Sequence, residues 1–133
     1  MSVKRKGSAK ERELANLLWQ KGCAVLRGCS SGGGVRKRYV PDIVVICRGK
    51  VLVVEVKYRS KYVPIRIEAE KLKKLIMFAE RAGGKAYLLV KYGREPWKVL
   101  DIMERVGREE YDKGVELKSF LESILSAKMD QYF

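Results

Sequence analysis

Two short motifs bring carboxylates and an amine to a spacing that could serve a metal ion. Residues 43–54 form a segment rich in β-branched residues. Asp42 directly precedes this segment, and Glu55 and Lys57 follow it. Arg48-Gly49 interrupts that segment, which predicts a β-hairpin with a two-residue loop. Such a loop pairs Asp42 with Glu55, and alternation along the strand puts Lys57 on the same face. A bulged turn at Gly49 would instead shift this register by one residue.

Two carboxylates and an ammonium at one end of a hairpin suit phosphodiester hydrolysis. That reaction needs a dication to neutralise the phosphate and activate a water. Mg²⁺, with Mn²⁺ as a substitute, takes hard oxygen ligands, and Lys57 could position the attacking water. The alternative is a solvated ion pair of purely structural value. The hairpin is apolar on both faces, which indicates a covered sheet where charges are costly, and we therefore favour the metal site.

The distribution of charge points to a polyanionic partner. The chain has 133 residues, enough for a single domain with its own core, and a net charge of +13. Residues 1–66 contain 16 Lys and Arg against 4 Asp and Glu, whereas residues 67–133 are nearly balanced. A mixed solvated surface would not separate the charges in this way. Membrane binding is the weaker alternative, because there is no apolar span, signal peptide or lipidation motif.

The complete lack of histidine excludes several classes of site. Ser-His-Asp and Cys-His catalysis, HNH-type nucleases and the commoner zinc sites all need that residue. The three cysteines are odd in number and lack C-x-x-C spacing, so we expect neither a disulfide framework nor a zinc cluster. Cys47 is then a small core residue, in a protein of the reducing cytoplasm. Scarce Asn and Gln beside many charged residues hint at a thermophile.

The pattern of apolar residues and turn signals predicts an α/β chain. In order, we expect a helix over 8–21, a strand over 23–27, a basic loop over 28–39, the hairpin, a helix over 66–82, strands over 86–91 and 97–100, and a helix over 115–128. The helix over 66–82 has a wide apolar arc that includes Met77 and Phe78, which favours a second subunit over a broad core. Neither a repeat nor a domain linker is present.

Glu11 has two interpretations. Ser8 and Glu11 match a capping box, which would make Glu11 the acidic member of a helix cap. Glu11 also lies in line with the buried stripe through Leu14 and Leu18, which keeps a role in the site open. Glu13 points elsewhere.

Basic residues cluster in three segments that could contact a nucleic-acid backbone. The Gly-rich loop over 28–39 lacks the ending of a P-loop, and we expect it to clamp nucleic acid rather than only to aid solubility. The basic residues of these segments are Lys4, Arg5 and Lys6 at the start of the chain, Arg36, Lys37 and Arg38 in the loop, and Arg59 and Lys61 after the hairpin.

Taken together, the motifs resemble the archaeal Holliday junction resolvases of the Hjc type, within the PD-(D/E)XK nucleases. The resemblance covers most of residues 4–92 and continues more weakly through Trp97. The matching motifs are Lys6-Gly7-Ser8-Ala9 with Glu11-Arg12, Gly22 to Arg27, Ser31-Gly32, Pro41-Asp42-Ile43-Val44, Glu55-Val56-Lys57, and Phe78-Ala79 with Gly83-Gly84.

This resemblance implies a restriction-endonuclease-like PD-(D/E)XK core, a central mixed β-sheet flanked by helices. It implies a homodimer that cuts two opposed strands of a four-way junction in recombination and repair. Glu11, Asp42 and Glu55 would be metal ligands together with the Val56 carbonyl, and Lys57 would serve the attacking water. Ser31, or else its neighbour Ser30, matches a serine that the family brings towards the site, and Arg12 and Arg27 match positions used against the DNA backbone.

Two other functions remain open. A nuclease of the same core could act on linear or damaged duplex, but the chain leaves no room for an appended domain that reads sequence. A non-catalytic basic DNA-binding protein is the other alternative, against which the intact Asp42, Glu55 and Lys57 argue.

Overall fold

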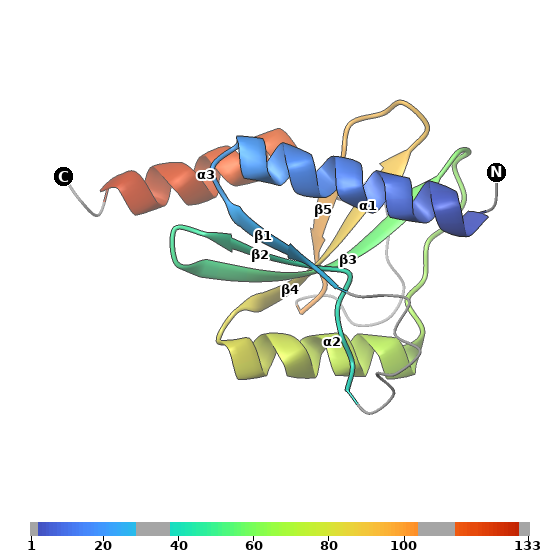
Figure 1. The fold of residues 1–133 in the computed structure, drawn as a ribbon, viewed down its shortest axis with the longest axis horizontal. Helices are drawn as coiled ribbons and strands as arrows, with labels where there is room; N and C mark the ends of the chain where they lie inside the picture. Colours follow the sequence, from blue (N-terminus) through green and yellow to red (C-terminus); the bar gives the residue numbers. More distant parts are fainter. Residues whose placement is uncertain (1–2, 29–37, 104–113, 131–133) are drawn as a thin grey trace.

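The structure is a computed structural model that describes residues 3–28, 38–103 and 114–130, with the side chains of 8–28, 38–103 and 114–125. Its elements are α1 (Val3–Gln20), β1 (Ala24–Arg27), β2 (Ile43–Cys47), β3 (Lys50–Arg59), α2 (Ala69–Ala82), β4 (Lys85–Tyr92), β5 (Lys98–Asp101), β6 (Val115–Glu116) and α3 (Leu117–Asp130). The six strands form one sheet in chain order (Figure 1). Only β3 and β4 run parallel, so the predicted mixed sheet flanked by helices is confirmed.

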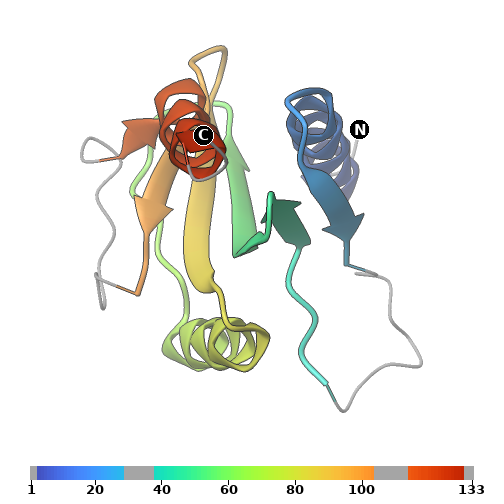
Figure 2. The ribbon, with the colours of Figure 1, turned by 90° about the vertical axis from the view of Figure 1, so that its left-hand side faces the viewer.

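The three helices cover the two faces of the sheet unequally. Seen along the sheet, α1 and α3 lie on one face, and α2 lies on the other face beneath β3 and β4 (Figure 2). The core on the first side includes Leu14, Val54 and Leu121, and the core on the second side includes Val53 and Leu75. Because side chains alternate along a strand, Glu55 belongs to the α2 side together with Val53.

The predicted hairpin and its register are confirmed. Ile43 pairs with Val54, and Arg48 and Gly49 form a two-residue loop between β2 and β3. Both loop residues have positive φ, 51° at Arg48 and 88° at Gly49, as a type I′ turn requires. The next pair beyond β2 in this register is Asp42 with Glu55, so no bulge displaces the two carboxylates.

Several predicted helix and strand boundaries are wrong. α1 begins at Val3 rather than Ser8, because Lys and Arg favour a helix and extend it through the basic start of the chain. α2 begins at Ala69 rather than at 66, and residues 115–116, expected to be helical, form the short strand β6. None of the helices within the described ranges is long and apolar enough to cross a membrane.

The predicted ends of the first two helices are confirmed to within one residue. Gly22 and Gly83 have φ of 101° and 70°. α2 ends at Ala82 as predicted, and α1 ends at Gln20, one residue earlier than predicted. The amide of Cys23 donates to the Leu18 carbonyl, and that of Gly84 donates to the Ala79 carbonyl. These are the bonds of a Schellman motif, which needs a residue that tolerates positive φ.

The expectation that the hairpin is covered on both faces holds for β3 but not for β2. On β3, Leu52, Val53 and Val54 are all buried. On β2, Val45 is buried but Ile46 is 36 % exposed, because α2 does not extend beneath this edge of the sheet (Figure 2). An apolar strand face is therefore left without a described helix over it.

The cysteine prediction is also wrong, since Cys23 and Cys47 form a disulfide. Ala24 pairs with Ile46, so one further step in the same register puts the two cysteines opposite each other with Cα atoms 4.4 Å apart. That separation lies within the range that a disulfide bridges. The disulfide also removes the support that the cysteines gave to a reducing compartment.

Removing this disulfide should destabilise the fold without removing any residue of the carboxylate site. The bond closes a loop with a sequence separation of 24, and loss of such a cross-link costs about 3 kcal/mol. We expect Cys23→Ala/Cys47→Ala to lower the free energy of unfolding by about that amount in guanidinium titrations. Cys29→Ala, which leaves the pair intact, is the control. Unfolding midpoints of the unsubstituted protein that agree with and without dithiothreitol would contradict the assignment.

Candidate active site

Asp42 is held directly before β2 by two backbone amides, one from Gly28, which follows β1, and one from Val56 on β3. The Gly28 amide donates to the Asp42 carbonyl at 2.8 Å, and the Val56 amide donates to Asp42 Oδ2 at 2.9 Å. A Cβ on Gly28 would meet the Pro41 carbonyl oxygen at 2.1 Å, so this close approach of backbone requires glycine. The Asp42 side chain is therefore fixed beside β3, where it accepts from the amide of the residue that follows Glu55.

Glu55 is a carboxylate in the interior of the sheet. It is 1 % exposed, and its Oε2 lies 3.3 Å from Lys57 Nζ and 2.7 Å from Lys71 Nζ. Its other oxygen, Oε1, is buried and has no hydrogen-bond partner among the described residues. A buried carboxylate oxygen without a donor is costly, which indicates that the site is built for a further ligand.

The electrostatics of the site also favour entry of a cation. Burial raises the pKa of Glu55 above its ordinary value, the nearby charge of Asp42 raises it further, and Lys71 and Lys57 oppose this. Burial of the Lys71 ammonium works to lower its pKa, but contact with Glu55 and the charges of Asp42 and Glu11 outweigh burial and raise it. Burial and the charge of Asp42 together thus outweigh the two lysines, and the charged form of Glu55 is left disfavoured.

Glu11 lies on the edge of this site, next to Arg27 on β1. Arg27 Nη2 is 3.5 Å from Glu11 Oε1, and the same nitrogen is 3.3 Å from the Ser8 carbonyl and from Ser8 Oγ. Burial raises the pKa of Glu11, the charge of Asp42 adds to this, and Arg27 opposes it. Ser8 lies inside α1, so the capping-box interpretation of Glu11 is wrong, and the electrostatic link to Asp42 favours the interpretation as a site residue.

Substitution of Glu11 and of Glu13 should distinguish a residue of the site from a surface residue of the same helix. The side chain of Glu13 is 45 % exposed and pairs with Lys10 at 3.2 Å and with Lys91 at 3.1 Å. Such exposed ion pairs contribute little to stability. We expect Glu11→Gln to lower the rate of phosphodiester cleavage by roughly tenfold or more, as loss of a metal-site group does. Glu13→Gln should change it little under identical conditions. Equal rates for the two variants would remove Glu11 from the site.

The residues present fit a dication, although not as a closed cluster of side chains. Within the described ranges, no group of three His, Cys, Asp or Glu residues is arranged to hold a metal ion. Mg²⁺ commonly uses only one or two carboxylates and completes its shell with water and substrate phosphate oxygens. Asp42 and the unpartnered Oε1 of Glu55 supply that kind of donor.

The structure describes only some of the predicted DNA-contacting residues. Arg12, Arg38, Arg59 and Lys61 are exposed, and Arg27 is exposed apart from its contacts with α1. The backbones of Lys4, Arg5 and Lys6 lie in α1, but their side chains are outside the described ones. Ser31, Arg36 and Lys37 lie outside the described residues altogether.

Two residues of the site were not predicted from the sequence. Lys71 reaches Glu55 from the first turn of α2, and the half-buried Tyr39 lies close enough to Glu55 and Asp42 to respond to both charges. Burial, and then those two carboxylates, raise the pKa of Tyr39. The Tyr39 hydroxyl is buried with no hydrogen-bond partner in the described part of the chain. Neither residue belongs to a motif, since each is brought to the site by tertiary packing.

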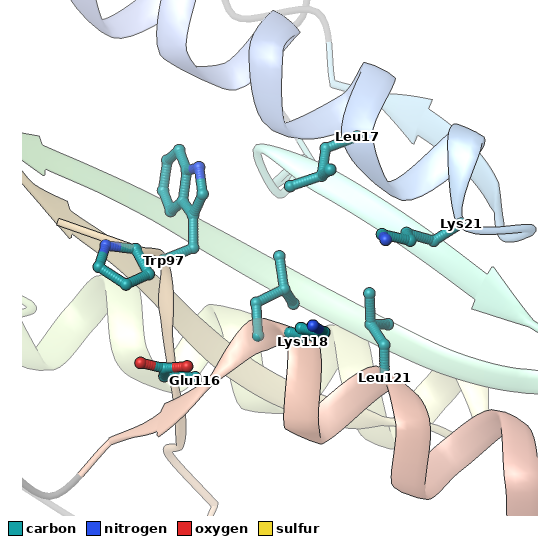
Figure 3. Close-up of a pocket in the computed structure, with 8 residues that line it drawn as sticks. Leu17, Lys21, Trp97, Glu116, Lys118 and Leu121 are labelled. Carbon is teal, nitrogen blue, oxygen red and sulfur yellow. The ribbon is translucent and has the colours of Figure 1, made fainter. Parts of the chain in front are cut away.

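A separate apolar pocket lies on the opposite side of the sheet from Glu55. Leu17, Trp97 and Leu121 line it between α1 and α3, together with Lys21, Pro96, Glu116, Leu117 and Lys118, and its volume is about 280 Å³ (Figure 3). Because its lining holds neither Asp42 nor Glu55, this pocket is not part of the carboxylate site.

Comparison with known proteins assigns the chain to a family. A family model described as archaeal Holliday junction resolvase (Hjc) matches residues 2–129. The crossover junction endodeoxyribonuclease Hjc of Sulfurisphaera tokodaii is 33 % identical over 98 % of both chains, and that of Methanocaldococcus jannaschii is 42 % identical over 68 % of this chain and 62 % of its own. The crystal structure of Archaeoglobus fulgidus Hjc matches with a TM-score of 0.76 at 30 % identity, covering 86 % of this chain and 99 % of that one. The chain therefore belongs to the archaeal Holliday junction resolvase (Hjc) family.

Proposed function

We propose that this chain is a crossover junction endodeoxyribonuclease that resolves four-way DNA junctions by metal-dependent phosphodiester hydrolysis. Membership of the Hjc family supports the substrate. The observation that carries the chemistry is the buried Glu55 next to Asp42. One of its carboxylate oxygens has no hydrogen-bond partner in the described part of the chain, and Lys57 lies 3.3 Å from the other. We place this activity in recombination and repair, in the cytoplasm.

Each residue of the site has a proposed role. Asp42 and Glu55 would hold Mg²⁺, or Mn²⁺ in its place, with Glu11 and the Val56 carbonyl as further ligands. When bound, the dication neutralises the phosphate and lowers the pKa of a water. Lys57 orients the attacking water and offsets negative charge in the transition state. Ser31 would approach from the basic loop.

DNA affinity in this proposal comes from the basic first half of the chain. Residues 1–66 carry most of the excess positive charge, and Arg12, Arg38, Arg59 and Lys61 expose theirs. Contacts to phosphates position DNA without reading its sequence, so selectivity for a junction would come from shape. Carboxylate substitutions should therefore affect cleavage and basic substitutions should affect binding.

The experiment that tests this function compares a four-way junction with a duplex of equal length. We expect Mg²⁺ to support cleavage of the junction in two opposed strands, EDTA to abolish it, and the duplex to remain uncut. Equal cleavage of junction and duplex would instead favour a nuclease of the same core that acts on linear DNA. Tight junction binding without cleavage in Mg²⁺ or Mn²⁺ would favour a non-catalytic DNA-binding protein.

A homodimer is the second part of the proposal. Resolution needs two matched incisions, and one chain offers one candidate site. Met77 on α2 is 48 % exposed, and Leu26 and Ile46 are 65 % and 36 % exposed on the part of the α2 side of the sheet that α2 leaves uncovered (Figure 2). We propose that these three exposed apolar residues, Leu26, Ile46 and Met77, called the dimer patch below, take part in the contact between two copies.

The dimer can be tested by disrupting the dimer patch with a charge. Wild-type protein at micromolar concentration should sediment at twice the chain mass, and Ile46→Glu/Met77→Glu should sediment as a monomer and lose paired incision. Trp19→Glu is a matched control, since Trp19 is 65 % exposed on α1 and lies outside the dimer patch. A wild-type monomer that resolves junctions at full rate would contradict the dimer.

A further inference from the structure

We propose that Lys71 is a built-in counter-ion of Glu55 in the metal-free site, and that the metal must compete with its ammonium for that carboxylate. This inference rests on the proposed metal-dependent function and deepens it. Lys71 is thereby a positioning residue that sets how tightly the site binds metal, distinct from Lys57, which acts on the water.

The geometry around Glu55 carries this assignment. Lys71 Nζ lies 2.7 Å from Glu55 Oε2, closer than Lys57 Nζ at 3.3 Å, and both ammoniums contact the same oxygen. Glu55 is 1 % exposed, and a buried carboxylate needs a compensating charge. Without a metal, Lys71 and Lys57 provide it. A dication bound to Oε1 would lie on the same carboxylate as the ammonium that contacts Oε2, and repulsion between the two cations would favour release of Lys71.

The position of Lys71 within α2 supports a role tied to the site. Lys71 lies in the first turn of α2, where the helix dipole disfavours a cation. The contact with Glu55 therefore accounts for the placement of the ammonium.

The Lys71 side chain can also leave without disturbing the core. It is 41 % exposed, whereas Lys57, on the central strand β3, is 22 % exposed. A long side chain at the rim of a site can swing its ammonium into water while its backbone stays in place. Displacement by metal thus needs only rotamer changes of Lys71.

Calorimetric titration of the DNA-free protein with Mn²⁺ tests the inference. Lys71→Met keeps most of the length of the side chain and removes the charge, so it should bind Mn²⁺ about tenfold more tightly than wild type. The same variant should melt at a lower temperature than wild type in EDTA, because Glu55 loses its counter-ion. Its melting temperature should also rise more than that of wild type when Mn²⁺ is added. Lys71→Gln, which can still donate a neutral hydrogen bond to Glu55, should bind Mn²⁺ more tightly than wild type even if Lys71→Met does not fold.

Two controls separate this effect from net charge. Lys74→Met removes the same charge from an exposed position on the same helix and should bind Mn²⁺ as wild type does. Lys71→Arg keeps the charge and should keep the weaker affinity. Mn²⁺ affinity that is unchanged or lower in both Lys71→Met and Lys71→Gln would overturn the inference.

The result for Glu55→Gln shows which proposal has failed. Loss of Mn²⁺ binding in this variant, with wild-type affinity in Lys71→Met, would refute only the role of Lys71. Unchanged Mn²⁺ binding in Glu55→Gln would refute the metal site itself, and the role of Lys71 with it.

Discussion

Asp42→Asn and Glu55→Gln are each expected to lower junction cleavage by more than about a hundredfold while leaving junction binding intact. Both substitutions keep the size of the side chain but remove the negative charge that a dication requires. Affinity for the junction depends on the basic first half of the chain, which neither variant alters. Single-turnover cleavage in Mg²⁺ and gel-shift titration in EDTA would measure the two properties separately.

Glu70→Gln is the matched control for these variants. Glu70 is an exposed carboxylate in the first turn of α2, next to Lys71 in sequence. Its substitution should leave both cleavage and binding close to wild type. Near wild-type cleavage by either Asp42→Asn or Glu55→Gln would show that the hydrolytic site has been misassigned.

The second large effect concerns salt. Each phosphate that the protein neutralises releases condensed counter-ions, so a protein with 6–10 such contacts loses roughly 10³–10⁵ in affinity between 50 and 200 mM salt. We expect a loss of this size for the junction. Arg36→Ala/Lys37→Ala/Arg38→Ala should reduce the slope of log K against log salt by roughly 2 to 3. Fluorescence anisotropy titrations of labelled junction at several salt concentrations would measure this slope.

A second triple variant controls for the change in net charge. Lys73→Ala/Lys74→Ala/Lys118→Ala removes three charges from residues 67–133, where acidic and basic residues nearly balance. Its slope should remain close to wild type. If the two triple variants have equal slopes, the basic loop is not part of the DNA-binding surface.

The positions of Asp42, Glu55 and Lys57 relative to one another could be predicted because they depend on local sequence. A two-residue loop at Arg48-Gly49 leaves one register for the hairpin, and that register pairs Asp42 with Glu55. Lys57 follows from strand alternation, and its contact with Glu55 at 3.3 Å confirms it. These relations span few residues, so tertiary structure has little opportunity to change them.

Contacts between elements distant in sequence could not be predicted in the same way. Lys71 meets Glu55 only because α2 packs beneath β3, and no periodic pattern reveals the direction in which a surface lysine turns. The Cys23–Cys47 disulfide depends on how β1 pairs with β2 across the loop over 28–39. No turn geometry sets that pairing, and cysteine spacing alone carried no signal of it.

Cleavage of a plasmid that carries one extruded cruciform by mixed dimers tests the central claim most directly. Wild-type and Glu55→Gln chains with different affinity tags would be combined, and dimers that carry both tags purified. With one site per chain and one incision per site, wild-type dimers should yield linear plasmid, mixed dimers nicked circles, and Glu55→Gln dimers no product. Linear product from mixed dimers at the wild-type rate would contradict the account, because a single intact Glu55 would then suffice for both incisions.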